Sequence, residues 1–288
     1  MRRLVSTFGI LAAIGILASG VVVQAEDIPT INPAGEVIPT APVPVDWLRV
    51  EINIPARELR LIERERIVGA YPVAIGQVAY KSIVMEDFIT RIEWNPWWYP
   101  PPSPWAAGSS VTPPGPKNPL GPVKLPLSHG IRIHGTNKES SVGRAASHGC
   151  FRMRNTDAVT LAWYLQTHLT DKGDQALLEK YGKHRGTTFH VALDQPVPIT
   201  IVYEPVRVKD DVLYLYPDVY GKVRNWFEKI ANALTAEGID VTKLEPERVD
   251  GLRRDLRKGP LTIHLQDLFR APQGDQTVST NFSPAVPK

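Results

Sequence analysis

The residues between positions 131 and 155 combine the side chains that a thiol enzyme needs. This segment reads IRIHGTNKESSVGRAASHGCFRMRN and contains Cys150, the only cysteine among 288 residues. His134 lies sixteen residues upstream of Cys150, and His148 lies two residues upstream. An imidazole within reach of a thiol can remove its proton and so produce a nucleophilic thiolate. The pattern therefore indicates cysteine chemistry, in which sulfur attacks an electrophile such as a carbonyl carbon.

Strand alternation predicts where the upstream histidine points. In IRIHG the two isoleucines lie on one face of a strand, and Arg132 and His134 lie on the other. His134 is therefore expected to point away from the core. Gly149 gives the backbone freedom to turn sharply before Cys150, so that the amides of these two residues can converge on an oxyanion.

The same alternation places the thiol beside two arginines. In CFRMRN, Phe151 and Met153 are expected to point inward, and Cys150, Arg152 and Arg154 are expected to share the opposite face. Neighbouring cations favour the thiolate form of a cysteine. The arginines are therefore expected to support the nucleophile.

Less reactive interpretations of these residues stay open at this point. The cysteine could be buried and inert, the histidine before it could be a loop residue bonded to backbone, and the arginines could form a solvated strand face. A zinc site is a further alternative, with four possible ligands within 22 residues: His129, His134, His148 and Cys150. Their spacing lacks the short paired intervals typical of structural zinc. No metal and no cofactor is expected.

The motif as a whole resembles the L,D-transpeptidases of the bacterial cell wall, which have a YkuD-type catalytic domain. That family carries a His, a gap, then Ser/Thr-His-Gly-Cys and commonly an Arg two places on, and the matching residues here are His134, Gly135, Ser147, His148, Gly149, Cys150 and Arg152. Upstream, PPGPKNPLG at 113–121 and WNPWWYPPPS at 94–103 are similar to segments of periplasmic members. The resemblance covers about residues 47–216.

The resemblance implies a role for each matching residue. Cys150 would be the nucleophile, His134 the proton acceptor and donor, and Gly135 the residue whose backbone carbonyl orients that histidine. The backbone of 148–150 would form the oxyanion hole. Arg152, together with Arg154, would bind carboxylates of the substrate through paired hydrogen bonds.

The implied reaction is a two-step acyl transfer on peptidoglycan stem tetrapeptides. A thioester forms with loss of a terminal D-alanine, and an amine of a second stem then makes a 3-3 crosslink. With water as the acceptor the enzyme would be an L,D-carboxypeptidase, and with a lysine of an outer-membrane lipoprotein it would attach or release that lipoprotein. A non-catalytic wall-binding protein is the alternative from a different class.

Two segments depart from the family pattern. QVAYKSIVMEDF at 77–88 stands where many members have a Thr-Pro-x-Gly turn, so this loop is expected to have a different shape. Residues 166–186 form a polar, helix-compatible insertion, which predicts a small helical cap beside the active site. The Trp/Pro-rich loop from Trp94 to Trp105 is expected either to line the substrate groove or to pack on the sheet.

The expected fold is mainly β with a few helices. The resemblance implies a mixed β-sandwich or open barrel with the helical cap insertion and a helical C-terminal extension at 217–270. Residue patterns predict strands at 47–54, 57–62, 67–75, 123–127, 131–134, 187–193, 197–203 and 206–216. The strands at 57–62 and 67–75 are expected to form a hairpin. Helices are predicted from 155 or 156 to 169 and after 220.

The N-terminal residues predict export. Arg2 and Arg3 precede an apolar run that ends in Val23-Gln24-Ala25, as in a signal peptide at 1–25, with an uncleaved membrane anchor as the alternative. A proline-rich linker at 26–46 would lead to a catalytic domain at 47–216, and a flexible tail would occupy 271–288. These features predict a periplasmic protein.

Composition bounds the partners. The chain is 43% hydrophobic and 22% charged, which suits a globular enzyme, and its net charge of +3 falls to about +1 once the two leader arginines are removed. That balance argues against nucleic acid as a partner. Peptidoglycan stem peptides are the expected substrate, and the oligomeric state is left open.

Overall fold

The computed structural model describes residues 44–270. The predicted signal peptide, most of the predicted linker and the predicted tail lie outside the described residues. Within the described part, the residues up to about 203, together with Val219 and Tyr220, surround one large hydrophobic core, and the other residues from Val206 onward build a second.

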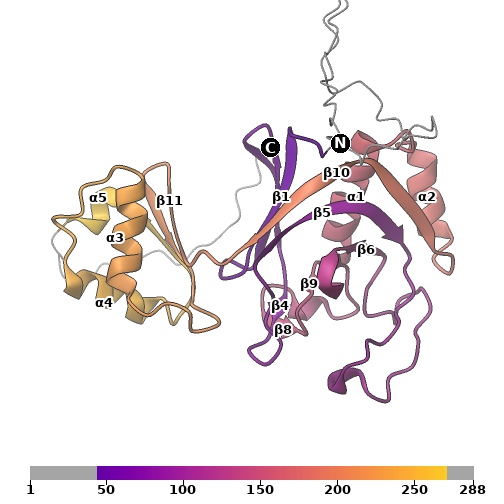
Figure 1. Ribbon diagram of the computed structural model, residues 1–288, viewed down its shortest axis with the longest axis horizontal. Helices are drawn as coiled ribbons and strands as arrows, with labels where there is room; N and C mark the ends of the chain where they lie inside the picture. Colours follow the sequence, from indigo (N-terminus) through magenta and orange to yellow (C-terminus); the bar gives the residue numbers. More distant parts are fainter. Residues whose placement is uncertain (1–43, 271–288) are drawn as a thin grey trace, which may run out of the picture. The chain divides into compact units, whose positions relative to one another are not determined.

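An eight-stranded sheet forms the main body. Its strand order is β3-β2-β1-β10-β5-β6-β7-β9, and β5 and β10 are long, strongly curved strands (Figure 1). The strands have the following bounds: β1 Leu48–Asn53, β2 Glu58–Glu63, β3 Arg66–Pro72, β5 Met85–Trp94, β6 Val123–Pro126, β7 Arg132–His134, β9 Phe151–Arg152 and β10 Phe189–Val202. A separate two-stranded parallel pair joins β4 (Ile75–Gly76) to β8 (Ala145–Ser147). The prediction of a mainly β fold with a few helices, of the mixed β-sandwich or open-barrel type, is confirmed, and the large sheet is open and curled.

Alternating apolar residues explain the central strands. In β1, Leu48, Val50 and Ile52 are almost fully buried, while the residues between them are partly exposed. Burying side chains of this size contributes ~1.5–3 kcal/mol each. Helix α1 (Asn155–Leu169) packs against β10 and β6, and the prediction of a buried helix at this place is confirmed.

Strand β5 was not predicted from the sequence. Its segment, MEDFITRIEW, mixes charged and apolar residues, yet it pairs with β10 on one side and with β6 on the other. The two strands predicted at 187–193 and 197–203 form one continuous strand, β10, with a register shift between Ala192 and Val197. Pairing along the whole of β5 holds this interrupted segment in one sheet.

The predicted cap insertion contains helix α2 (Gln175–Lys183). Buried polar contacts attach it to the sheet: the Trp94 indole N–H donates to Oε1 of Gln166 (2.8 Å), and Nε2 of Gln166 donates to the hydroxyl of Tyr181 (3.2 Å). The rings of Trp94 and Tyr181 stack with centroids 4.8 Å apart. The segment is therefore packed into the main core.

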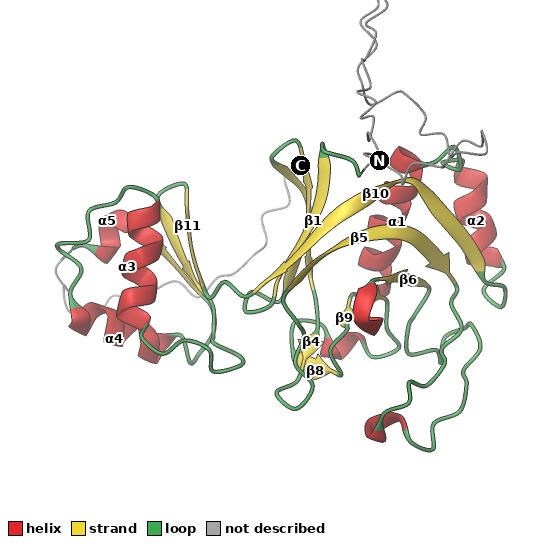
Figure 2. Ribbon diagram, in the orientation of Figure 1, coloured by secondary structure: helices red, strands yellow, loops and turns green. Residues whose placement is uncertain are grey.

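The C-terminal residues form a smaller α/β unit with its own core. Strands β11 (Val206–Lys209), β12 (Val212–Leu215) and β13 (Leu261–His264) make an antiparallel sheet. The helices are α3 (Trp226–Ala236), α4 (Pro246–Asp255) and α5 (Leu265–Leu268), which are labelled with β11 in Figure 2. The strands predicted at 206–216 therefore belong to a sheet with β13 and not to the large sheet. Strand β13 was not predicted, and α4 and α5 lie in the range 217–270, which was predicted as a helical extension without individual bounds for them. No helix between residues 44 and 270 is long and apolar enough to cross a membrane.

Candidate active site

Parallel pairing of β7 with β9 brings the two halves of the motif together. Ile133 pairs with Phe151 and His134 with Arg152, and the amide of Met153 donates to the carbonyl of His134 at 2.8 Å. Cys150 immediately precedes β9. The histidine strand and the cysteine segment are therefore neighbours in one sheet.

A serine side chain closes the turn before the cysteine. The hydroxyl of Ser147 accepts from the amide of Gly149 (3.1 Å) and donates to the carbonyl of Cys150 (2.6 Å). Gly149 has φ of 108°, a backbone conformation that residues with a Cβ rarely adopt. The Gly149 amide is thus occupied, and the amide of Cys150 has no acceptor among the described residues.

His134 is buried, with 5% of its surface exposed, although it does not belong to the hydrophobic core that contains Ile133. Its Nδ1 lies 2.5 Å from the carbonyl oxygen of Gly135. A carbonyl can only accept, so the proton is on Nδ1 and Nε2 carries the free lone pair. This contact agrees with the orienting role that the resemblance implied for Gly135.

Burial controls the ionisation of His134. The pKa of His134 is lowered to about 3, mainly because burial removes its hydration; the bond to Gly135 opposes this shift, and the positive charges of Arg152, Arg132 and Lys124 contribute to it. The imidazole is therefore neutral at neutral pH and can accept a proton.

The thiol has an arginine neighbour that sequence reasoning did not assign to the site. Sγ of Cys150 lies 4.0 Å from Nη1 of Arg132 and 3.8 Å from the carbonyl oxygen of Gly130. Among the described residues, no hydrogen bond joins this sulfur to His134. The signal for Arg132 was present in the alternation that put it on the same strand face as His134.

Arg152 is close enough to Cys150 for their charges to interact. Its guanidinium is partly buried, which lowers its pKa, and the negative charge of a thiolate at Cys150 acts to raise it. Arg154 lies elsewhere: it immediately precedes α1, with its guanidinium 4.0 Å from the carboxylate of Asp157. A substrate-binding role for Arg154 stays a prediction.

His148 is held between two aromatic rings. The indole of Trp105 stacks on it with centroids 4.0 Å apart and an interplanar angle of 7°, and the ring of Tyr80 meets it edge-on at 4.8 Å. Burial lowers the pKa of His148, and the charge of Arg152 adds to this. The Trp/Pro-rich loop therefore reaches the site through Trp105.

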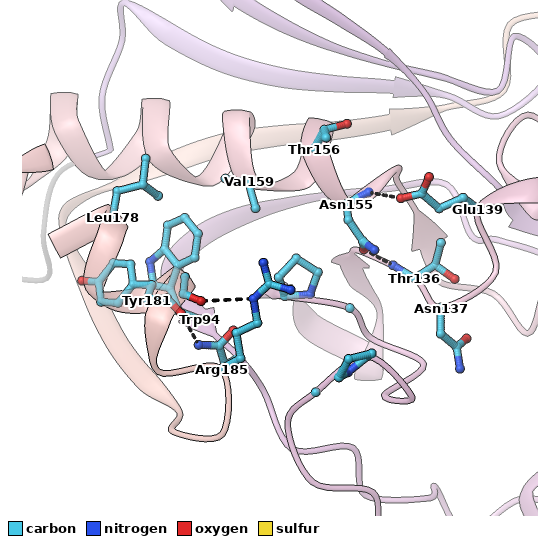
Figure 3. Close-up of a pocket in the computed structure, with 16 residues that line it drawn as sticks. Trp94, Thr136, Asn137, Glu139, Asn155, Thr156, Val159, Leu178, Tyr181 and Arg185 are labelled. Carbon is cyan, nitrogen blue, oxygen red and sulfur yellow. Dashed lines mark hydrogen bonds between the residues drawn. The ribbon is translucent and has the colours of Figure 1, made fainter. Parts of the chain in front are cut away.

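A separate cavity of about 610 Å³ lies beside the start of α1 (Figure 3). The side-chain oxygen of Asn155 accepts from the backbone amide of Thr136 there, and the backbone amide of Asn155 donates to the carboxylate of Glu139. Tyr181 and Arg185 of the predicted cap form part of the wall. Cys150, His134 and the arginines near the sulfur do not line it. Within residues 44–270, no three His, Cys, Asp or Glu side chains come together as a metal-binding group.

Comparison with known proteins identifies the family. The YkuD family model, the L,D-transpeptidase catalytic domain, matches residues 48–199, which is more than half of the chain. This protein therefore belongs to the L,D-transpeptidase family of the YkuD type. The two halves of the site described above, on β7 and before β9, both lie inside the matched range.

Individual relatives agree with this assignment. The chain is 35% identical over 115 residues to YkuD of Bacillus licheniformis, covering 40% of this chain and 58% of that protein. It is 32% identical over 133 residues to YbiS of Escherichia coli K12, covering 42% of this chain and 43% of the relative. The matches thus span about half of the length of these curated relatives. Both carry names that place them among the L,D-transpeptidases.

Solved structures of L,D-transpeptidases are also similar, at low identity. L,D-transpeptidase 3 from Mycobacterium tuberculosis matches with a TM-score of 0.37 and 13% identity, over 54% of this chain and 61% of that one. The C442S mutant of the Enterococcus faecium enzyme matches with a TM-score of 0.36 and 10% identity, over 55% and 50% respectively.

Proposed function

We propose that this protein is a cysteine-dependent L,D-transpeptidase that acts on the stem peptides of peptidoglycan. The observation that carries the proposal is the parallel pairing of β7 with β9. It brings a neutral His134, with a free lone pair on Nε2, into the same sheet as the segment that presents Cys150. A base, a thiol and an amide without an acceptor at Cys150 are the groups that acyl transfer requires.

The first step forms a thioester. Sγ of Cys150 attacks the carbonyl carbon between the third stem residue and a terminal D-alanine, and the thiol proton passes to Nε2 of His134. The amide bond then breaks as this proton moves to the departing amine. D-alanine leaves, and the acyl group stays on sulfur. The amide of Cys150 stabilises the negative oxygen that exists between these events.

The second step regenerates the thiol. The side-chain amine of a second stem attacks the thioester carbon and gives up a proton through His134, and the carbon–sulfur bond breaks. The product is a 3-3 crosslink. The arginines near the sulfur, Arg132 and Arg152, are proposed to bind carboxylates of the stems, and Arg154 is proposed to do so from the start of α1.

The same thioester serves other acceptors. Water would make the enzyme an L,D-carboxypeptidase, and a lysine of an outer-membrane lipoprotein would attach or, in reverse, release that lipoprotein. The neutral base and the acceptor-free amide favour any of these over a wall-binding protein without catalysis. The proposal needs no metal and no cofactor.

The proposed location is the periplasm, with export through the predicted signal at 1–25 and a linker at 26–46. The catalytic domain is proposed at 47–216 with its cap at 166–186, followed by the extension at 217–270 and the tail at 271–288. Strands β11 and β12 share a hydrophobic core with the helices of that extension, and β12 pairs with β13.

Incubation with purified sacculi followed by analysis of the released muropeptides tests the proposal. The wild-type protein should produce 3-3 crosslinked dimers, and both Cys150→Ser and His134→Ala should abolish them while far-UV circular dichroism stays unchanged. His190→Ala is the matched control, because this histidine is exposed on β10. Tripeptides without dimers would identify the carboxypeptidase, and retained activity in Cys150→Ser would refute the nucleophile.

A further inference from the structure

A buried serine outside the family motif contacts the peptide bond next to the nucleophile. Ser82 lies in the loop before β5, the segment whose sequence departs from the family pattern, and is 3% exposed. Its hydroxyl accepts from the amide of Gly76 (2.9 Å) and donates to the carbonyl oxygen of Gly149 (2.9 Å). A hydroxyl has one proton. Because the Gly76 amide can only donate to it, the Ser82 proton is free to go to the Gly149 carbonyl, and the direction of both hydrogen bonds is fixed.

The bond to Gly149 fixes the direction of the Cys150 amide. In a planar trans peptide, the carbonyl of one residue and the N–H of the next point in opposite directions. Because the Gly149 carbonyl points at Ser82, the Cys150 N–H points away from Ser82. This N–H is the one that has no acceptor among the described residues.

A glycine makes this peptide easy to reorient. The positive φ of Gly149 is one of several conformations that glycine adopts at little cost, so the turn by itself does not select one carbonyl direction. Ser147 holds the amide of Gly149 from one side, and Ser82 holds its carbonyl from the other. Without Ser82, the buried carbonyl would lack its partner, which favours rotation of the peptide.

Tyr220 supports Ser82 from the segment that leads into α3. Its hydroxyl accepts from the amide of Ser82 (3.0 Å) and donates to the carbonyl of Gly76 (2.7 Å), and the side chain is buried in the main core. A Cβ on Gly76 would lie 2.1 Å from the carbonyl oxygen of Tyr80, so the loop closes tightly at this glycine. Tyr203 accepts in turn from the amide of Tyr220 (2.9 Å).

We propose that Ser82 is a positioning residue that orients the Gly149–Cys150 peptide, so that the Cys150 amide faces the oxyanion, and that Tyr220 holds Ser82 in place. This inference rests on the proposed function, because it assumes that Cys150 attacks a carbonyl group. It adds two residues, from segments about 70 residues before and after the nucleophile, to the machinery of that reaction.

Two reagents separate positioning from a general structural effect. Iodoacetamide alkylates sulfur by displacement and forms no oxyanion, whereas a carbapenem is attacked at its carbonyl and forms one. Loss of an oxyanion donor costs about 10²- to 10³-fold. Ser82→Ala displaces the donor without removing it, so we expect carbapenem acylation to slow by about 10- to 100-fold while alkylation stays within about twofold of the wild-type rate.

Matched variants complete the experiment. Tyr220→Phe should slow acylation in the same selective way but less strongly, Ser82→Thr should restore the rate, and Ser110→Ala, an exposed serine, should change nothing. Equal slowing of both reagents, or of neither, in Ser82→Ala would overturn the inference. If that variant does not fold, selective slowing in Tyr220→Phe supports the inference and an unchanged rate overturns it.

Failure of the proposed function has a different signature. A wild-type protein that gains no carbapenem adduct at Cys150 by intact mass spectrometry would refute the acyl-transfer chemistry itself. In contrast, a wild-type protein that is acylated at Cys150 as fast as its Ser82→Ala variant would refute only the positioning role.

Discussion

The burial of His134 should make the stability of the fold depend on pH. In the folded state its pKa is about 3, whereas an unfolded chain has a histidine pKa of 6.5. Between these values the unfolded chain binds a proton at this position and the folded protein does not. The free energy of unfolding therefore falls as pH falls below about 6.5, and the contribution is fully present above that pH.

The size of this change in the free energy of unfolding follows from the pH interval between the two pKa values. Each pKa unit corresponds to ~1.36 kcal/mol, so lowering the pH by about two units from 6.5 should remove ~2.7 kcal/mol through this residue alone. Other groups titrate in the same range. A variant that cannot be protonated there, His134→Gln, separates the contribution of His134 from theirs.

Urea unfolding followed by circular dichroism at several pH values measures the effect. The wild-type protein should lose ~2.7 kcal/mol more than His134→Gln between about pH 6.5 and 4.5. His190→Gln, at an exposed position, should follow the wild-type curve. Parallel curves for wild type and His134→Gln would refute the buried neutral imidazole. A wild type that is relatively more stable at low pH would point instead to a histidine held in its charged form.

Three further changes test other contacts. Arg132→Ala should slow alkylation of the thiol at fixed pH by about 3- to 10-fold, because its guanidinium lies 4.0 Å from the sulfur; an unchanged rate would exclude this contact in solution. Trp105→Ala should raise the pKa of His148 toward its ordinary value, since burial is the main cause of its lowering, and an NMR titration would show whether it does. Gln166→Ala should lower the free energy of unfolding by about 2–4 kcal/mol, measured with urea, because it leaves the Trp94 N–H buried without a partner. A loss below about 0.5 kcal/mol, the usual range for exposed positions, would contradict that role.

Local patterns predicted the reactive segment because it depends on short-range rules. Alternation predicted β7 and put Phe151 and Met153 on the buried side, and the spacing of His134 and Cys150 matched the family motif. Alternation did not predict the burial of His134, because this residue is on the strand face opposite Ile133 and yet both residues are buried. When both faces of a sheet are packed, the side chains on the two faces of a strand do not differ in burial.

The remaining parts depend on contacts between distant residues. Strand β5 has no clean period, and its existence follows from pairing with β6 and β10. Ser82 and Tyr220 approach the nucleophile only after the chain has folded, since the first lies 67 residues from Gly149 and the second 138 residues from Ser82. Neither residue has a local pattern that marks it as functional.

The stack of Trp105 on His148 gives the site an internal magnetic probe. An imidazole parallel to an indole at 4.0 Å lies within the ring-current field of the larger ring, so its carbon-bound protons should resonate at unusually high field. Undocking of the Trp/Pro-rich loop would remove this shielding and return the signals toward ordinary positions. Loop motions on the microsecond to millisecond scale would then broaden the same resonances. The arrival of substrate between loop and sulfur could thus be followed at one histidine without any added label.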